Sequence, residues 1–118
     1  MDLKKDIPES AVIAEVKAII KATGINLQRI NTGCFVIGTG RNRRFIKTAD
    51  AGTCDFEGYD NIGRFVAIEC KRPSGGRLSS AQKERIDDIN ATGGVAVVVH
   101  SGEEALKQLQ ERGCIKID

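Results

Sequence analysis

The 118-residue sequence lacks the long apolar segments that membrane or secreted proteins need. No apolar run reaches the roughly 18 residues of a transmembrane helix, so we expect no membrane partner. The first ten residues, MDLKKDIPES, contain no apolar stretch typical of a secretion signal. The length suits one domain, residues 1–118, with a core of its own. These observations favour a single-domain cytoplasmic protein.

The sequence also has no closely spaced cysteine pair and very little histidine. The cysteines stand at 34, 54, 70 and 114, none in a C-x-x-C pair, and His100 is the single histidine. A zinc site needs closer ligands, so buried reduced thiols are the better interpretation. A Ser/His/Asp triad would depend on His100 alone, and no G-x-S-x-G is present. Gly38-Thr39-Gly40 lacks the Gly-Lys-Ser/Thr of a phosphate-binding P-loop.

Positive charge is in small excess overall but is locally concentrated. The net charge of +2 does not by itself indicate a nucleic-acid-binding protein. The segment 41–47 contains no acid and four basic residues: Arg41, Arg43, Arg44 and Lys47. Arg72 and Arg77 follow Lys71 and flank a Gly/Ser loop. Both groups can bind phosphates, and solvated loops remain the alternative.

The apolar pattern predicts three helices. Residues 8–23 carry an apolar stripe with a 3.6-residue period, with Asp6 or Ser10 as a possible cap and Gly24 as the end. Capping boxes open two further helices, one from Ser79 over about 80–92 and one from Ser101 over about 102–112.

Short strands separated by turns occupy most of the remaining sequence. We expect strands at 27–31, 34–37, 43–47, 54–58, 64–71, 95–99 and 114–117. The segments 54–58 and 64–71 form a hairpin, and the apolar run 95–99 is typical of a strand covered on both faces. The predicted fold class is α/β, with a central mixed β-sheet flanked by helices on both sides.

The hairpin places unusual charges together. Glu69 and Lys71 are two residues apart on one strand and point to the same face. Asp55, at the start of the partner strand, is expected beside Glu69. Two carboxylates about 4 Å apart repel by about 4 kcal/mol at an effective dielectric constant of about 20. A divalent cation such as Mg²⁺ or Mn²⁺ removes that repulsion, whereas an exposed Glu–Lys ion pair is the simpler alternative.

This arrangement resembles the PD-(D/E)XK nuclease superfamily, which has a restriction-endonuclease-like core, and more narrowly its VRR-NUC (virus-type replication-repair nuclease) family. The resemblance extends from about residue 10 to 112 and rests on Gly52-Thr53-Cys54-Asp55, Glu69-Cys70-Lys71 and Leu78-Ser79-x-x-Gln82, followed by Gly93-Gly94 and an apolar strand. No proline precedes Asp55 as the superfamily name suggests, but a Gly-x-x-Asp form is usual in this family.

The resemblance implies a role for each matching residue. Asp55, Glu69 and the backbone carbonyl of Cys70 would hold Mg²⁺ or Mn²⁺, and Lys71 would be the catalytic lysine. Gln82 would be an active-site residue.

The resemblance also implies an outer acid on the first helix, Glu15. The residues alone leave simpler roles open for two of these side chains. Gln82 can serve only as the partner of Ser79 in a capping box, and Glu15 can pair with Lys17 or Lys21.

Together these features predict a metal-dependent DNA endonuclease that hydrolyses phosphodiester bonds. A small domain has little room to read base sequence, so recognition of DNA shape through phosphates is favoured. We expect a homodimeric Holliday-junction resolvase of replication, repair or recombination, acting on branched DNA in a bacterial or phage-infected cell. A flap or nonspecific nuclease, or a nucleic-acid-binding module without activity, remains the alternative.

Overall fold

The structure, a computed structural model, describes residues 6–31, 34–47 and 49–116. In that part of the chain it has a mixed α/β fold with three α-helices, a four-stranded sheet and a separate two-stranded sheet. None of the described helices is long and apolar enough to cross a membrane. The elements are α1 (Glu9–Thr23), β1 (Asn26–Arg29), β2 (Cys34–Ile37), the 3-10 turn η2 (Gly40–Asn42), β3 (Arg44–Lys47), β4 (Phe56–Tyr59), β5 (Phe65–Cys70), α2 (Ser80–Ala91), β6 (Val95–Val99) and α3 (Gly102–Glu111).

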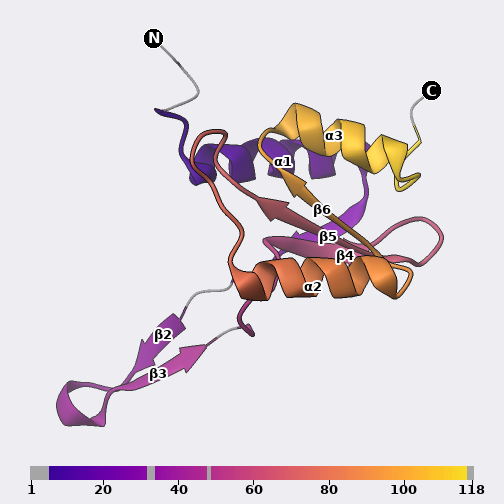
Figure 1. Ribbon diagram of the computed structural model, residues 1–118. Helices are drawn as coiled ribbons and strands as arrows, with labels where there is room; N and C mark the ends of the chain where they lie inside the picture. The colour runs from indigo at the N-terminus through magenta and orange to yellow at the C-terminus, as the bar shows by residue number, and fades with distance from the viewer. Residues whose placement is uncertain (1–5, 32–33, 48, 117–118) are drawn as a thin grey trace.

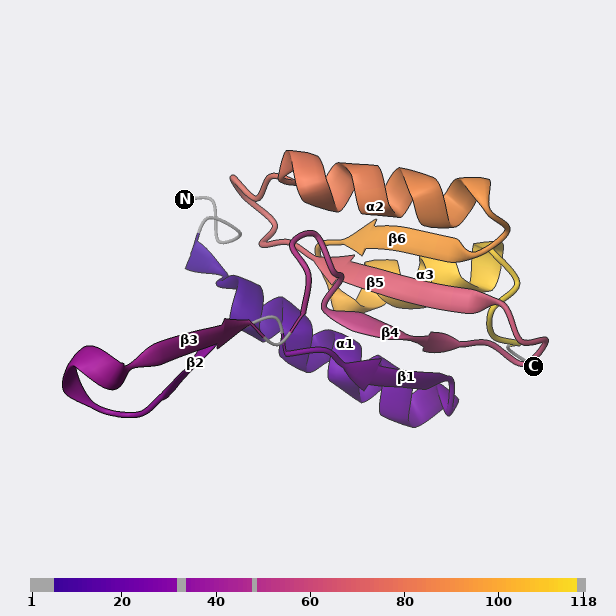
Figure 2. The same ribbon diagram turned by 90° about the horizontal axis from the view of Figure 1, so that it is seen from below.

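The main sheet is mixed and has helices on both faces, as the sequence predicted. Its strand order is β1-β4-β5-β6; β1, β4 and β5 are antiparallel neighbours, and β6 runs parallel to β5. Helix α2 covers one face, and α1 and α3 cover the other (Figures 1 and 2). The larger core cluster lies on the α1 and α3 side around Phe56 and Ile68, and a smaller one lies under α2 around Ala67 and Ile86.

Most helix ends follow local sequence signals. The capping box predicted at Ser101 is only half formed: Ser101 Oγ accepts from the main-chain N–H of Glu104, but the Glu104 side chain accepts from His100 and not from Ser101. Ser79 and Gln82 form the predicted capping box at the start of α2, and Gly24, in a left-handed conformation with φ of 74°, ends α1. Neither Asp6 nor Ser10 caps α1, because Pro8 occupies the cap position without any side-chain hydrogen bond. An extended residue that fixes φ is enough to begin this helix.

The predicted strand at 114–117 is wrong for its described residues. The main-chain N–H of Cys114 donates to the carbonyl of Leu109 at 2.8 Å, which closes the end of α3. Cys114 therefore packs into the core from a helix-ending turn, and residues 114–116 join no strand. Ile117 lies outside the described residues.

Residues 34–47 form a hairpin that does not join the main sheet, and we call it the arm. Strands β2 and β3 pair with each other in the register Phe35↔Ile46 and Val36↔Phe45. Figures 1 and 2 show the arm projecting from the body on the side where α1 and α2 begin. The sequence predicted both strands but not their separation from the central sheet.

Candidate active site

Asp55 and Glu69 meet at the end of the main sheet where β5 and β6 finish. Phe56 pairs with Ile68, so one further step along the register sets Asp55 opposite Glu69. Both are buried, with 8% and 2% of their surface exposed. The main-chain N–H of Cys70 donates to Asp55 Oδ2 at 2.8 Å and holds this carboxylate against β5. The predicted juxtaposition of the two acids is confirmed.

The turn before Asp55 explains why glycine stands at position 52. Gly52 has φ of +87°, and a Cβ added there would lie 2.5 Å from the carbonyl oxygen of Ala81 in the first turn of α2. Any side chain would push the turn away from the helix. Gly52 thus brings the Asp55 loop close to the α2 segment that carries Gln82.

Glu69 is the least satisfied polar group of the site. Its Oε1 accepts a hydrogen bond from Gln82 Nε2 at 3.0 Å and lies 3.5 Å from Lys71 Nζ. Its Oε2 is buried and has no hydrogen-bond partner among the described residues. Burial first, and the neighbouring Asp55 carboxylate second, raise the pKa of Glu69 to about 8, although Lys71 acts in the opposite direction.

Lys71 occupies an enclosed position between two acids. Its side chain is 12% exposed, and Nζ lies 3.5 Å from Glu69 Oε1 and 3.9 Å from Glu9 Oε1. Glu9, in the first turn of α1, was not a candidate in the sequence, because an acid at a helix start is commonly explained by the helix dipole. The structure makes it the α1 acid that reaches Lys71.

Glu15 has a different partner. Its Oε1 accepts a hydrogen bond from the main-chain N–H of Gly102 at 3.0 Å, at the beginning of α3. Gly102 permits this approach, since a Cβ added to it would lie 2.9 Å from Glu15 Cβ. Glu15 therefore satisfies an otherwise unpaired helix N–H, a role that neither sequence interpretation foresaw.

Gln82 takes part in the predicted capping box and also contacts Glu69. The main-chain N–H of Ser79 donates to Gln82 Oε1 at 2.9 Å, and Gln82 Nε2 donates to Glu69 Oε1. The oxygen of one amide caps α2 while its nitrogen orients the buried carboxylate. The capping box and the candidate site are therefore one hydrogen-bonded unit.

Arg29 is a second residue that the sequence did not single out. Its guanidinium lies 3.5 Å from Asp55 Oδ1, donates to the Asp55 carbonyl oxygen at 3.1 Å and stands 5.8 Å above the ring of Phe56. The signal available in the sequence was its place at the end of a strand, but β1 pairs with β4 only in the folded sheet. Arg29 is thus a cation held beside the acidic pair.

The candidate DNA-binding residues occupy two separate places. Arg41, Arg43 and Arg44 are exposed on the arm, whereas Arg72 and Arg77 are exposed in the loop that follows β5. The side chain of Lys47 lies outside the described part of the structure.

The donor set limits what metal the site can hold. Among the described residues, no group of three or more His, Cys, Asp or Glu side chains is arranged to hold a metal ion. Burial first, then the charge of Glu69, raises the pKa of the Cys54 thiol to about 12, so it stays protonated. Cys54, Cys70 and Cys114 are free and buried, as expected for reduced core thiols. Two carboxylates beside a backbone fit a hard ion that keeps several waters, such as Mg²⁺.

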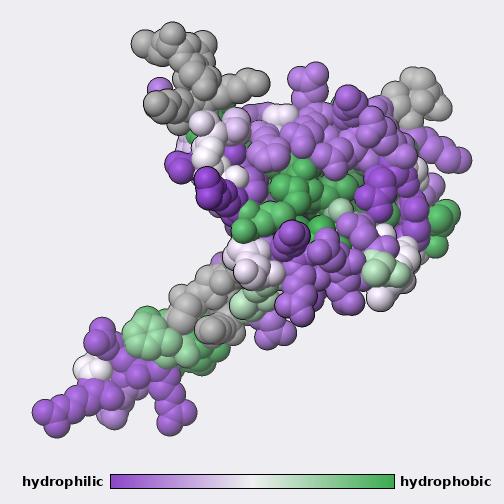
Figure 3. Space-filling model, in the orientation of Figure 1, coloured by the Kyte–Doolittle hydropathy of each residue, from purple (hydrophilic) through white to green (hydrophobic). Residues whose placement is uncertain are grey.

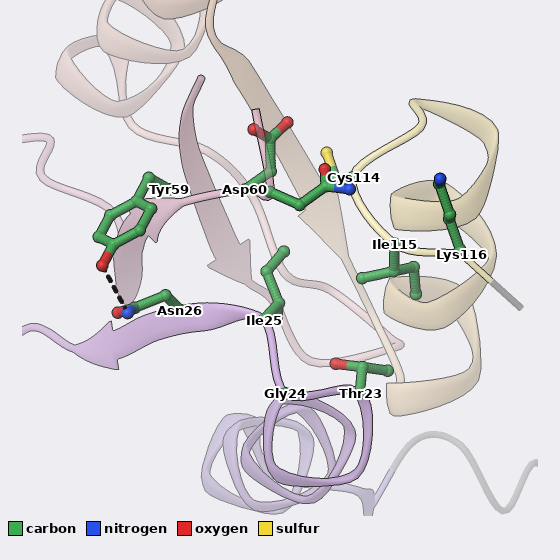
Figure 4. Close-up of a pocket in the computed structure, with 10 residues that line it drawn as sticks. Thr23, Gly24, Ile25, Asn26, Tyr59, Asp60, Cys114, Ile115 and Lys116 are labelled. Atoms are coloured by element: carbon green, nitrogen blue, oxygen red, sulfur yellow. Dashed lines mark hydrogen bonds between the residues drawn. The ribbon is translucent and has the colours of Figure 1, made fainter. Parts of the chain in front are cut away.

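A separate hollow of about 370 Å³ lies where β1, the end of β4 and the segment after α3 come together (Figure 4). Asn26 Nδ2 donates to Tyr59 Oη across one side of it. Asp60 also lines this hollow, and its hydrogen bonds to Ile62 and Arg64 leave it no free oxygen for a ligand. The acidic pair at Asp55 and Glu69 is therefore the better candidate for chemistry.

Comparison with known proteins returned no match: no family model, no curated protein and no solved structure matches the chain.

Proposed function

We propose that the protein is a metal-dependent DNA endonuclease that hydrolyses phosphodiester bonds. The observation that carries the proposal is the buried Oε2 of Glu69, which has no hydrogen-bond partner in the described part of the chain, on a residue that lies beside a second acid, Asp55. Such a group is unfavourable in a folded protein unless something binds it. Strongly perturbed ionisable groups of this kind gather at functional sites.

The residues fit Mg²⁺ or Mn²⁺. Asp55 and Glu69 would hold the ion, with the backbone carbonyl of Cys70 as the further ligand that the resemblance to VRR-NUC nucleases implies. When bound, the ion would neutralise the carboxylates and acidify a coordinated water. Mg²⁺ sites commonly use one or two carboxylates together with waters and substrate phosphate, which suits this small donor set.

The neighbouring side chains support the same chemistry. Gln82 holds one oxygen of Glu69 through its amide, and the other oxygen has no hydrogen-bond partner among the described residues. Lys71, enclosed and paired with Glu69 and Glu9, presents a cation where a phosphate group would gain negative charge. The Lys71 side chain is only 12% exposed, which argues against the simpler alternative of a solvent-exposed Glu–Lys ion pair.

DNA is the proposed substrate, and branched DNA the preferred one. Exposed arginines on the arm and after β5 offer contacts to phosphates, which read DNA shape rather than base sequence. Two symmetric cuts in a four-way junction require two sites, which a twofold homodimer supplies. The particular proposal is thus a homodimeric Holliday-junction resolvase of the PD-(D/E)XK type.

The test compares Lys71→Ala with Lys17→Ala, which removes an exposed lysine from the middle of α1. Cleavage of a labelled four-way junction should require Mg²⁺ or Mn²⁺ and stop in EDTA. Lys71→Ala should cut at least about a hundredfold more slowly while binding the junction normally, because the lysine acts on the reacting group. Lys17→Ala should cut like the parent protein.

Four outcomes would count against the proposal. Full cleavage in EDTA would show that the reaction needs no metal ion. Unimpaired cleavage by Lys71→Ala would show that Lys71 is not a catalytic residue. Binding of DNA without cleavage under any of these metals would leave a binding module in place of an enzyme. Equal cutting of junction, flap and duplex would replace the resolvase with a nonspecific nuclease.

A further inference from the structure

The arm, residues 34–47, extends far beyond the body of the protein. The molecule measures 57 × 43 × 27 Å, and its radius of gyration is 15.8 Å. A compact domain of this length has a radius of gyration of about 13.5 Å. In Figure 3 the arm stands clear of the body, with apolar surface along its stem and polar surface at its tip. Strands β2 and β3 pair only with each other in the described structure.

Both faces of the stem carry exposed apolar side chains. Val36 and Phe45 are cross-strand partners on one face, 49% and 69% exposed. By alternation Ile37 and Ile46 lie on the other face, 53% and 40% exposed. An isolated two-stranded hairpin is at best marginally stable in water. A stem that is apolar on both sides therefore needs another apolar surface against it.

The charge of the arm is opposite to that of the rest of the chain. Of 18 basic and 16 acidic residues, four basic and no acidic residues lie within 34–47. The remainder thus has 14 basic and 16 acidic residues, a net charge of −2 against +4 on the arm. The tip of one arm is therefore repelled by another tip and attracted to the body of another molecule.

The distribution of side chains along the arm favours a protein partner over DNA. A ribbon that wedges into DNA inserts apolar side chains between base steps, which calls for them at its leading end. Here the leading end carries Arg41 and Arg43, while the apolar residues lie along the stem. Phosphates cannot cover such a stem, whereas an identical stem can.

We propose that the arm is the surface through which two copies of this chain associate. The apolar stem of each arm packs on the stem of the partner copy's arm. A twofold axis sets the two arms antiparallel, so that the basic tips point away from each other. The inference deepens the proposed function and rests on its homodimer, for which it names the contact surface.

The experiment measures molar mass by light scattering without DNA or metal. The parent protein should have twice the 12.7 kDa mass of the chain. The double variant Val36→Ser, Phe45→Ser should raise the dimer dissociation constant at least about tenfold, because buried aromatic anchors dominate interfaces. Ile62→Ser is the matched control: it removes a residue that is 71% exposed on the body, and it should leave the dimer intact.

A second measurement uses the unaltered protein, in case the double variant folds poorly. Amide hydrogen exchange in residues 34–47 should slow at high protein concentration and speed up on dilution, while exchange in β5 stays constant. A parent protein that is monomeric, or exchange that ignores concentration, would overturn the inference. A double variant that remains dimeric but loses DNA affinity would make the apolar stem part of the DNA-binding surface instead.

These results are independent of cleavage. A protein that dimerises through the stem but never cuts DNA would reject the nuclease and keep the interface. A protein that cuts DNA as a monomer would keep the nuclease and reject the interface.

Discussion

Two buried carboxylates, Asp60 and Glu69, stand at opposite ends of the β4–β5 hairpin and differ in every other respect. Asp60 is fully satisfied: Oδ1 accepts hydrogen bonds from the main-chain N–H groups of Ile62 at 3.0 Å and Arg64 at 2.9 Å, and Oδ2 accepts one from Arg64 Nε at 2.7 Å. Glu69 has both of its cationic or amide partners on one oxygen, and its other oxygen has none in the described structure.

As a result, the pKa values of the two acids are shifted in opposite directions. Burial acts to raise the pKa of Asp60, but the hydrogen bonds and charge of Arg64 and the N–H of Ile62 outweigh it and lower that pKa. Burial and Asp55 raise the pKa of Glu69 to about 8. Burial alone therefore does not decide whether the pKa of a carboxyl group rises or falls; the number and charge of its partners do.

The largest expected effect breaks this comparison by mutation. Asp60→Ala leaves two main-chain N–H groups and the Arg64 guanidinium without an acceptor, which should lower the free energy of unfolding by about 3 kcal/mol. Glu69→Gln keeps the side-chain volume and cannot take up the negative charge that burial and Asp55 oppose at this position, so without metal it should change stability by less than about 1 kcal/mol or raise it.

Urea denaturation in EDTA measures the free energy of unfolding of both variants. The dependence of that free energy on urea concentration should be the same in both, which shows that they expose similar surface on unfolding. The matched control is Asp87→Ala, which removes an exposed acid from α2. If Glu69→Gln destabilised the protein as much as Asp60→Ala, Glu69 would be a structural acid as well, and the contrast would fail.

A smaller effect sharpens the comparison through pH. The folded pKa of Glu69, about 8, lies above its ordinary value of 4.5, so between these values the folded protein keeps a proton that the unfolded chain has lost. The contribution is fully present below about pH 4.5 and disappears as pH rises to about 8. The free energy of unfolding should therefore fall by up to about 1.4 kcal/mol per pH unit in this window.

Asp60 gives the opposite dependence at lower pH. Its folded pKa is below the ordinary 3.8, so its stabilisation is present above that value and is lost as pH falls through the folded pKa. Subtracting the free energy of unfolding of Glu69→Gln from that of the parent at each pH from 5 to 8, both in EDTA, isolates the Glu69 contribution from that of all other groups. A flat difference would contradict the raised pKa.

The sequence could predict the parts of the site that follow from local pairing. Asp55 and Glu69 belong to one hairpin, and the ends of a hairpin lie opposite each other whatever surrounds them. Gln82 belongs to a capping box with Ser79, so its place at the start of α2 could also be predicted. The three helices, the mixed sheet and the buried strand at 95–99 follow from periodicity in the same way.

The missed features depend on contacts between distant elements. Glu9 reaches Lys71 only because of the way α1 crosses the sheet, and Glu15 meets Gly102 through the packing of α1 on α3. The arm shows the same limit: alternation predicts its two strands, but no local pattern tells whether a hairpin joins the central sheet or stands apart from it.

The smallest expected effect tests the link between the capping box and the acidic pair. Gln82→Glu keeps an oxygen for the main-chain N–H of Ser79 but replaces the amide that donates to Glu69 Oε1 with a second acceptor. The helix start should survive, with stability changed by about 1 kcal/mol or less. Cleavage in saturating Mg²⁺ should fall by about tenfold, because the orienting hydrogen bond to Glu69 is lost. The matched control is Glu104→Gln at the corresponding position of α3, three residues after the cap Ser101, where the side chain accepts a hydrogen bond from the main-chain N–H of His100. Junction cleavage and thermal unfolding of both variants decide the outcome: a Gln82→Glu protein that cuts as fast as Glu104→Gln would show that Gln82 only caps the helix, and Glu69 would then need no orienting amide.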